Sequence, residues 1–72
     1  MTSSVYNVVE LIGSSPTSWE EAAANAVRQA ADGISRDIRI AEVVEQDVLI
    51  DATEIVAYRA KVRLSYKQAV AP

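Results

Sequence analysis

Acidic side chains interrupt an otherwise apolar stretch of strand-forming residues, IRIAEVVEQDVLID, which runs from Ile38 to Asp51. Carboxylate oxygens are the ligands that hard cations such as Ca²⁺ and Mg²⁺ take in proteins. Side chains alternate between the two faces of a strand, so Glu45 and Asp47 are same-face neighbours. The spacing therefore makes Glu45 and Asp47 the candidate metal ligands.

The other acids near this stretch occupy different positions. Strict alternation puts Glu42 on the opposite face, together with Ile40. Asp37 and Asp51 flank the strand and are secondary candidates for metal ligands. A hard cation needs about six oxygens or more, so two carboxylates cannot complete a site unless copies of the chain meet at a symmetry axis. The sequence contains no EF-hand loop.

A basic row offers a purely structural explanation for the same acids. Arg59, Lys61 and Arg63 alternate along the next expected strand and share one of its faces. In an antiparallel hairpin these bases can pair with the acids, each pair contributing about 0.2–1 kcal/mol. An ion pair is also the expected role of Glu10, the one charge in the first apolar strand.

Composition excludes several kinds of chemistry. The chain has no cysteine and no histidine, which rules out disulfides, thiolate metal sites and the commonest general base. Only two glycines are present, so there is no phosphate-binding glycine loop. The net charge is −3 and the bases are scattered, so nucleic-acid binding is not expected. We find neither a signal-peptide pattern nor an apolar run of ~20 residues, and expect a cytoplasmic protein with no membrane contact and no enzyme activity.

The order of elements predicts an α+β fold in a single domain, residues 1–72. Strands are expected at about 4–12, 37–50 and 54–67, and a helix at about 18–33, with Gly13 ending the first strand. Ser18 and Glu21 have the spacing of a capping box at the helix start. The expected packing is β-α-β-β, a three-stranded antiparallel sheet with the helix on one face. The apolar stripe predicted for the helix comprises Trp19, Ala23, Val27, Ala30 and Ile34.

The size of the chain favours self-assembly. A domain of 72 residues hides only about 60% of its unfolded surface and is marginal alone. A strand over residues 38–50 would reach roughly 43 Å at ~3.3 Å per residue. That length far exceeds the radius of gyration of about 11 Å expected for a compact chain of this length. The strand must therefore curl or overhang its own subunit, where a neighbouring copy can cover it.

Three segments together resemble the dodecin family: VYNVVELIGSSPTSWEEAAANAV, IRIAEVVEQDV and AYRAKVRLSY. They follow one another in the family's order and cover the chain from about Val5 to Tyr66. The resemblance implies a small subunit whose sheet wraps its helix, assembled into a hollow homododecamer of tetrahedral symmetry. Flavin-binding members of the family store riboflavin or its phosphorylated forms and catalyse no reaction.

Two positions depart from the flavin-binding pattern. Flavin-binding dodecins have a stacking tryptophan just before AEVV, where this chain has Ile40, and a glutamine after the strand-three aromatic, where Arg59 follows Tyr58. An aliphatic side chain offers no planar stacking, and a guanidinium cannot accept a hydrogen bond. The segments SPTSWE and EQD resemble the calcium dodecin branch instead. The expected function is a non-catalytic homododecameric cage that binds or stores a small ligand or cation, with Ca²⁺ favoured. The alternatives are a flavin dodecin with an altered pocket and a purely structural assembly.

Overall fold

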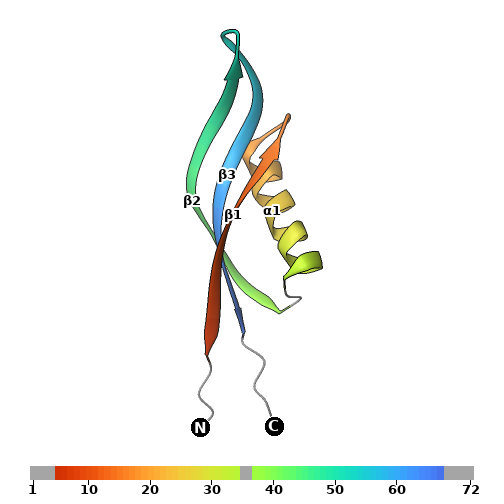
Figure 1. Cartoon of the computed structure of the whole chain (residues 1–72), viewed down its shortest axis with the longest axis vertical. Helices are drawn as coiled ribbons and strands as arrows, with labels where there is room; N and C mark the ends of the chain where they lie inside the picture. Colours follow the sequence, from red (N-terminus) through yellow and green to blue (C-terminus); the bar gives the residue numbers. More distant parts are fainter. Residues whose placement is uncertain (1–4, 35–36, 68–72) are drawn as a thin grey trace.

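The structure is a computed structural model that describes residues 5–34 and 37–67. Its elements are β1 (Tyr6–Ser15), α1 (Trp19–Gly33), β2 (Ile38–Asp51) and β3 (Glu54–Lys67). The strands form one antiparallel sheet in the order β1-β3-β2, and α1 lies against one face of it (Figure 1). This arrangement confirms the predicted β-α-β-β fold and the β2–β3 hairpin.

The strand β1 continues past Gly13 to Ser15, which the sequence did not predict. Gly13 is needed there because the helix passes very close: a Cβ atom built on Gly13 would lie 2.0 Å from the carbonyl oxygen of Ala22. The glycine therefore marks a close approach of strand and helix, and not the end of the strand.

Serine side chains define the start of α1. Ser18 is the N-cap, and its Oγ accepts a hydrogen bond from the backbone N–H of Glu21 at 3.0 Å. In the predicted capping box the Glu21 side chain would accept from the backbone N–H of Ser18. That N–H instead donates to Ser15 Oγ at 3.4 Å, and Ser15 Oγ also accepts from Thr17 N at 3.0 Å. The buried Ser15 thus organises the turn between β1 and α1.

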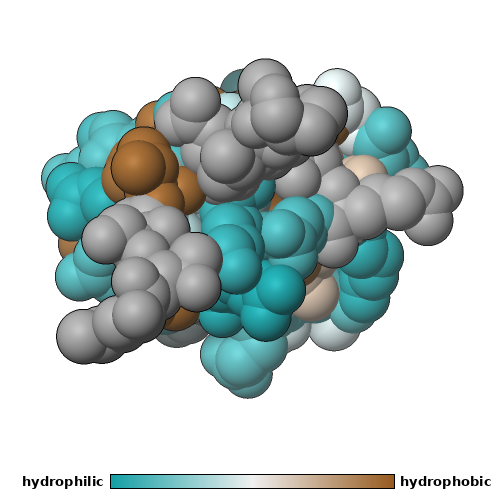
Figure 2. All heavy atoms as spheres, turned by 90° about the horizontal axis from the view of Figure 1, so that it is seen from below, coloured by the Kyte–Doolittle hydropathy of each residue, from teal (hydrophilic) through white to brown (hydrophobic). Residues whose placement is uncertain are grey.

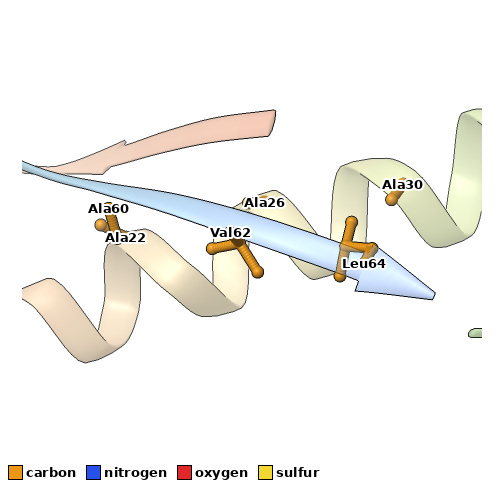
Figure 3. Close-up of a cluster of buried hydrophobic side chains, with 6 residues drawn as sticks. All are labelled: Ala22, Ala26, Ala30, Ala60, Val62 and Leu64. Carbon is orange, nitrogen blue, oxygen red and sulfur yellow. The ribbon is translucent and has the colours of Figure 1, made fainter. Parts of the chain in front are cut away.

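The core lies between α1 and the central strand β3. It consists of small and medium side chains that face each other across the interface (Figure 3): Ala22, Ala26, Ala30, Ala60, Val62 and Leu64. The three members from β3, Ala60, Val62 and Leu64, alternate with Arg59, Lys61 and Arg63 and so lie on the face opposite the predicted basic row. The alanines let the helix lie close to the sheet.

The buried face of α1 differs from the predicted stripe. Ala22 and Ala26 are buried, whereas the predicted Ala23 and Val27 are only half-buried beside them, and Ile34 is 43% exposed. The helix is turned so that its smallest side chains meet β1 at Gly13. Periodicity alone could not show this, because alanines occupy both sets of positions.

The hairpin of β2 and β3 projects beyond the end of the helix (Figure 1). The chain measures 55 × 20 × 14 Å, and its radius of gyration is 14.8 Å, against about 11 Å for a compact chain of this length. The expected overhang is therefore present. Seen from the end of the molecule opposite the β2–β3 turn, apolar surface is interspersed among hydrophilic side chains (Figure 2).

Candidate functional site

The acids of β2 lie on the sheet face that points away from α1. In the pairing of β2 with β3, Glu45 lies opposite Lys61 and Asp47 opposite Arg59. Glu45 and Asp47 are thus neighbours on one face, as the alternation of side chains predicted. Both side chains are exposed to solvent, at 64% and 54%.

Glu42 joins the same face, and the prediction that it points away from Glu45 and Asp47 is wrong. The pairing of β2 with β3 shifts register between Val43 and Glu45. An extra residue at such a bulge reverses the alternation on one side of it. Glu42 consequently lies opposite Arg63, in line with the other two acids. We call Glu42, Glu45 and Asp47 the acid row.

Each member of the acid row is paired with a base of β3. Arg59 forms a two-point contact with Asp47, with Nε–Oδ1 at 2.7 Å and Nη2–Oδ2 at 2.8 Å. Lys61 Nζ lies 2.7 Å from Glu45 Oε1, and Arg63 Nη1 lies 3.3 Å from Glu42 Oε1. These contacts confirm the predicted pairing of Glu45 and Asp47 with the basic row.

Arg63 is shared between two outer strands. Besides Glu42 on β2, its Nη2 contacts Glu10 Oε2 of β1 at 2.9 Å. The ion pair expected for Glu10 is therefore present, and it ties β1 to β2 through the central strand. Exposed ion pairs of this kind contribute little to stability one at a time, so their arrangement matters more than their number.

The ion pairs change the protonation equilibria of the row. The hydrogen bond from Arg59, with the nearby charges of Arg59 and Lys61, holds the pKa of Asp47 below its usual value. The hydrogen bond and charge of Glu45 raise the pKa of Lys61. Asp47 therefore stays ionised at neutral pH, the state that either a metal ion or an ion pair requires.

Two further features position the row relative to the helix. The indole Nε1 of Trp19 donates to the backbone carbonyl oxygen of Asp47 at 2.9 Å. The ring of Trp19 also meets Tyr58 edge-on, with 5.1 Å between the ring centres. Trp19, a member of the predicted apolar stripe of the helix, thus anchors the first helical turn against the sheet.

The secondary metal candidates lie apart from the acid row. Asp37 contacts Arg39, with Nε–Oδ1 at 2.8 Å, and Asp51 lies opposite Glu54 at the hairpin end. Within residues 5–34 and 37–67, no three acidic side chains come close enough together to hold a metal ion. The donor set of one subunit has the right chemistry for Ca²⁺, but it is too small for the about six oxygens that this ion takes.

A cavity of about 260 Å³ lies between β1 and α1. Its only neighbouring polar groups are amides and a hydroxyl, and it contains no acid or base of the rows described above. Asn25 Nδ2 donates to the carbonyl oxygen of Ser14 beside it, at 2.9 Å. The residues lining it are Leu11, Ile12, Gly13, Ser14, Asn25, Ala26 and Gln29. Its lining contains no carboxylate, so it offers a cation only neutral oxygens.

The residues at the two positions of the flavin-binding pattern make other contacts in this structure. Ile40 is 60% exposed and lies opposite Ser65. Arg59 donates hydrogen bonds to both carboxylate oxygens of Asp47.

Among the described residues, no helix has the length and hydrophobicity of a membrane span.

Comparison with known proteins places these features in a family. A family model for dodecins matches residues 5–69. Calcium dodecin of Mycobacterium tuberculosis is 52% identical over 64 residues, which cover 89% of this chain and 89% of that protein.

Solved structures agree in fold. The crystal structure of the M. tuberculosis calcium dodecin, described as a calcium-chelating antigen with a novel calcium-binding site, matches with a TM-score of 0.81 at 47% identity, covering 94% of this chain and 96% of that one. The dodecin of Streptomyces coelicolor matches with a TM-score of 0.89 at 24% identity, covering 99% and 100%, which supports the fold alone. The chain belongs to the dodecin family.

Proposed function

We propose that this protein is a non-catalytic dodecin that assembles into a homododecamer and binds or stores Ca²⁺. The observation that carries the proposal is the 52% identity to calcium dodecin over 89% of both chains. We expect it to act in the cytoplasm.

The shape of the subunit supports assembly. The hairpin overhang leaves apolar side chains in solvent, including Leu49, Ile50 and Ile55, at 50%, 59% and 55% exposure. Further large apolar side chains are exposed along the sheet, Val8 and Ile12 of β1 among them. Exposed large apolar side chains of this kind are typical of subunit interfaces. Copies of the chain would cover it and bring acid rows together.

Within that assembly, we assign Glu45 and Asp47 as metal ligands. They are adjacent, ionisable and exposed on one face of the sheet. Two carboxylates per subunit leave most of a Ca²⁺ coordination shell to be supplied by water or by other copies. The proposed site is therefore incomplete in a single chain. Asp37 and Asp51 lie apart from it and are not included.

Native mass spectrometry of protein purified without chelator tests both parts of the proposal. The expected spectrum shows a dodecamer with bound calcium, and the calcium is lost from the variant carrying Glu45→Gln and Asp47→Asn. Glu20→Gln is the matched control, because Glu20 is an exposed acid in the first turn of α1. A metal-free dodecamer after dialysis against Ca²⁺ would contradict the proposal.

A purely structural assembly is the second candidate, and one observation favours it: Glu45 and Asp47 already have basic partners within the chain. This alternative predicts that charge reversal at Asp47 or Arg59 dissociates the assembly, while the wild-type protein binds no ion. Measuring the assembled mass and the calcium content of the same samples separates the two functions.

Flavin binding receives no support from the site, since Ile40 and Arg59 cannot supply the stacking and the acceptor of the flavin-binding pattern. We expect no quenching of riboflavin fluorescence at micromolar protein. Quenching that saturates with protein concentration would restore this function as the leading one.

A further inference from the structure

The end of the β2–β3 hairpin carries an apolar pair next to two acids. Ile50 and Ile55 lie opposite each other beside the turn and are 59% and 55% exposed. Asp51 and Glu54 form the next pair along the hairpin, and both are exposed. We call residues 50–55 the hairpin tip. The tip projects beyond α1 in Figure 1, so the helix of its own chain does not cover it.

The turn within the hairpin tip has an unusual backbone. Ala52 and Thr53 both have positive φ, at 51° and 68°. Two successive residues of this kind are typical of a type I′ turn, where asparagine and glycine are preferred. A β-branched residue such as Thr53 is rarely found in this conformation, and such strain is concentrated at functional surfaces. The strained turn and the exposed apolar pair both indicate that the tip has a contact to make.

A surface of complementary character lies between β1 and α1. The cavity of about 260 Å³ there combines apolar side chains, namely Leu11, Ile12 and Ala26, with amides and a hydroxyl. Arg28 Nη1 donates to Oδ1 of Asn25, a lining residue, at 2.6 Å, which places a guanidinium beside the cavity. The cavity therefore offers apolar contacts and a positive charge, whereas the tip presents an apolar pair and negative charges.

The Arg28 guanidinium is exposed and has no carboxylate partner in the described part of the chain. Among the bases of that part, only Lys67 shares this property. Lys67 lies opposite Tyr6, at the end of β1 that is far from the cavity. Arg28 is thus the base beside an apolar cavity that can still accept an acidic partner.

We propose that the hairpin tip of one copy inserts into the cavity between β1 and α1 of a neighbouring copy. Ile50 and Ile55 then pack against the apolar lining, and Asp51 and Glu54 approach Arg28 of the partner subunit. Charge complementarity favours this contact over one between two tips, because the acids of two tips would repel each other. The inference rests on the proposed homododecamer and states how its copies join.

Charge exchange between the tip and the cavity tests the contact. Arg28→Glu and Glu54→Arg should each raise the protein concentration at which half of the assembly dissociates, by about 2- to 5-fold or more. The combined variant keeps the net charge of the wild type and restores an ion pair, so this concentration should return to within about twofold of the wild type. Sedimentation velocity over a dilution series measures it. Lys67→Glu is the matched control, because it reverses an exposed base that lies away from the cavity.

Chemical cross-linking gives a second measurement that does not depend on the strength of an ion pair. The chain has no cysteine, so Gln29→Cys in the cavity lining and Glu54→Cys at the tip introduce the only thiols. A short bis-maleimide should link the double variant into covalent dimers or trimers, the sizes that twofold and threefold axes allow. Each single-cysteine variant should remain a monomer on a denaturing gel, because like surfaces do not meet.

The outcomes separate this inference from the proposed function. Cross-links confined to the double variant support the inference, as does recovery in the charge-exchanged variant while Lys67→Glu stays near the wild type. A dodecamer that shows neither result overturns the inference and leaves the proposed assembly intact. Cross-links in Glu54→Cys alone also overturn it, because tips then meet tips. A wild-type protein that is monomeric throughout the dilution series overturns the proposed assembly and the inference together.

Discussion

Trp19 at the start of α1 donates its indole N–H to the backbone carbonyl oxygen of Asp47 in β2, with 2.9 Å between the two atoms. The same ring packs edge-on against Tyr58, the residue before Arg59. The only tryptophan of the chain is therefore in contact with the backbone of one proposed metal ligand and next to its counter-ion.

This contact predicts an optical signal for metal binding. Titration with CaCl₂ should change the emission intensity or wavelength of Trp19, because an ion bound at the Asp47 side chain changes the charge beside the indole. Glu45→Gln combined with Asp47→Asn should abolish the change, and Glu20→Gln should preserve it. Calcium uptake measured by calorimetry without any change in emission would show that the ion binds away from Asp47.

A pair of glycine substitutions tests the close packing of helix and strand. Gly13→Ala should destabilise the fold by about 1–3 kcal/mol or more, because its Cβ would collide with the carbonyl oxygen of Ala22, a backbone atom that cannot rotate away. Gly33→Ala is the control, since a Cβ there meets nothing within 4 Å. We expect it to be neutral or slightly stabilising in chemical unfolding followed by circular dichroism. Equal unfolding midpoints for the two variants would contradict the close approach.

Asp47 should make stability depend on acid pH. Its pKa in the folded protein is below the usual 3.8, so its ion pair stabilises the fold above about pH 4, and that contribution is lost as pH falls through the lower folded pKa. Arg59→Gln should return the pKa of Asp47 toward 3.8 and flatten the stability curve in this window. Carboxyl carbon NMR during acid titration measures the pKa directly.

The control for this titration is Lys61→Gln. Lys61 acts on Asp47 only through its charge, whereas Arg59 also donates the hydrogen bond that is the largest cause of the shift. Lys61→Gln should therefore raise the pKa of Asp47 by less than Arg59→Gln does. The reverse order would mean that the two-point contact of Arg59 does not persist in solution.

The hairpin end should be needed for assembly. Ile55→Asp places a charge on a side chain that is 55% exposed in the single subunit and that we expect to be covered by a neighbouring copy. Burying an unpaired charge is costly, so the proposed dodecamer should become a minor species in native mass spectrometry. Thr53→Asp adds the same charge within the turn, where Thr53 has a positive φ that Asp tolerates better than a β-branched residue. It should leave assembly unchanged, and loss of assembly in both variants would point to a general effect of charge.

Several features followed from the sequence because their causes are local. The order of strands and helix, the cap at Ser18 and the apolar face of β3 depend on residues that are neighbours along the chain. The pairing of an acidic strand with a basic one also followed, since a short turn joins them and makes them antiparallel.

Other features depended on how separate segments meet. The sequence placed Glu42 on the wrong face because the bulge near Val43 arises from the fit of β2 to β3 and not from the composition of β2. The buried face of α1 was displaced because Gly13 lets Ala22 approach, a contact between segments that no periodicity reveals.

The sequence by itself determined which residues carry carboxylates and which carry bases along the two strands, because charge and residue type are properties of the chain. Only the tertiary structure decided that Arg59 contacts both carboxylate oxygens of Asp47 while Lys61 contacts one of Glu45. It also decided that the indole of Trp19 is hydrogen-bonded to the backbone of Asp47 in β2. Strand register and helix rotation set those contacts, and both are the result of packing elements that lie far apart in the sequence.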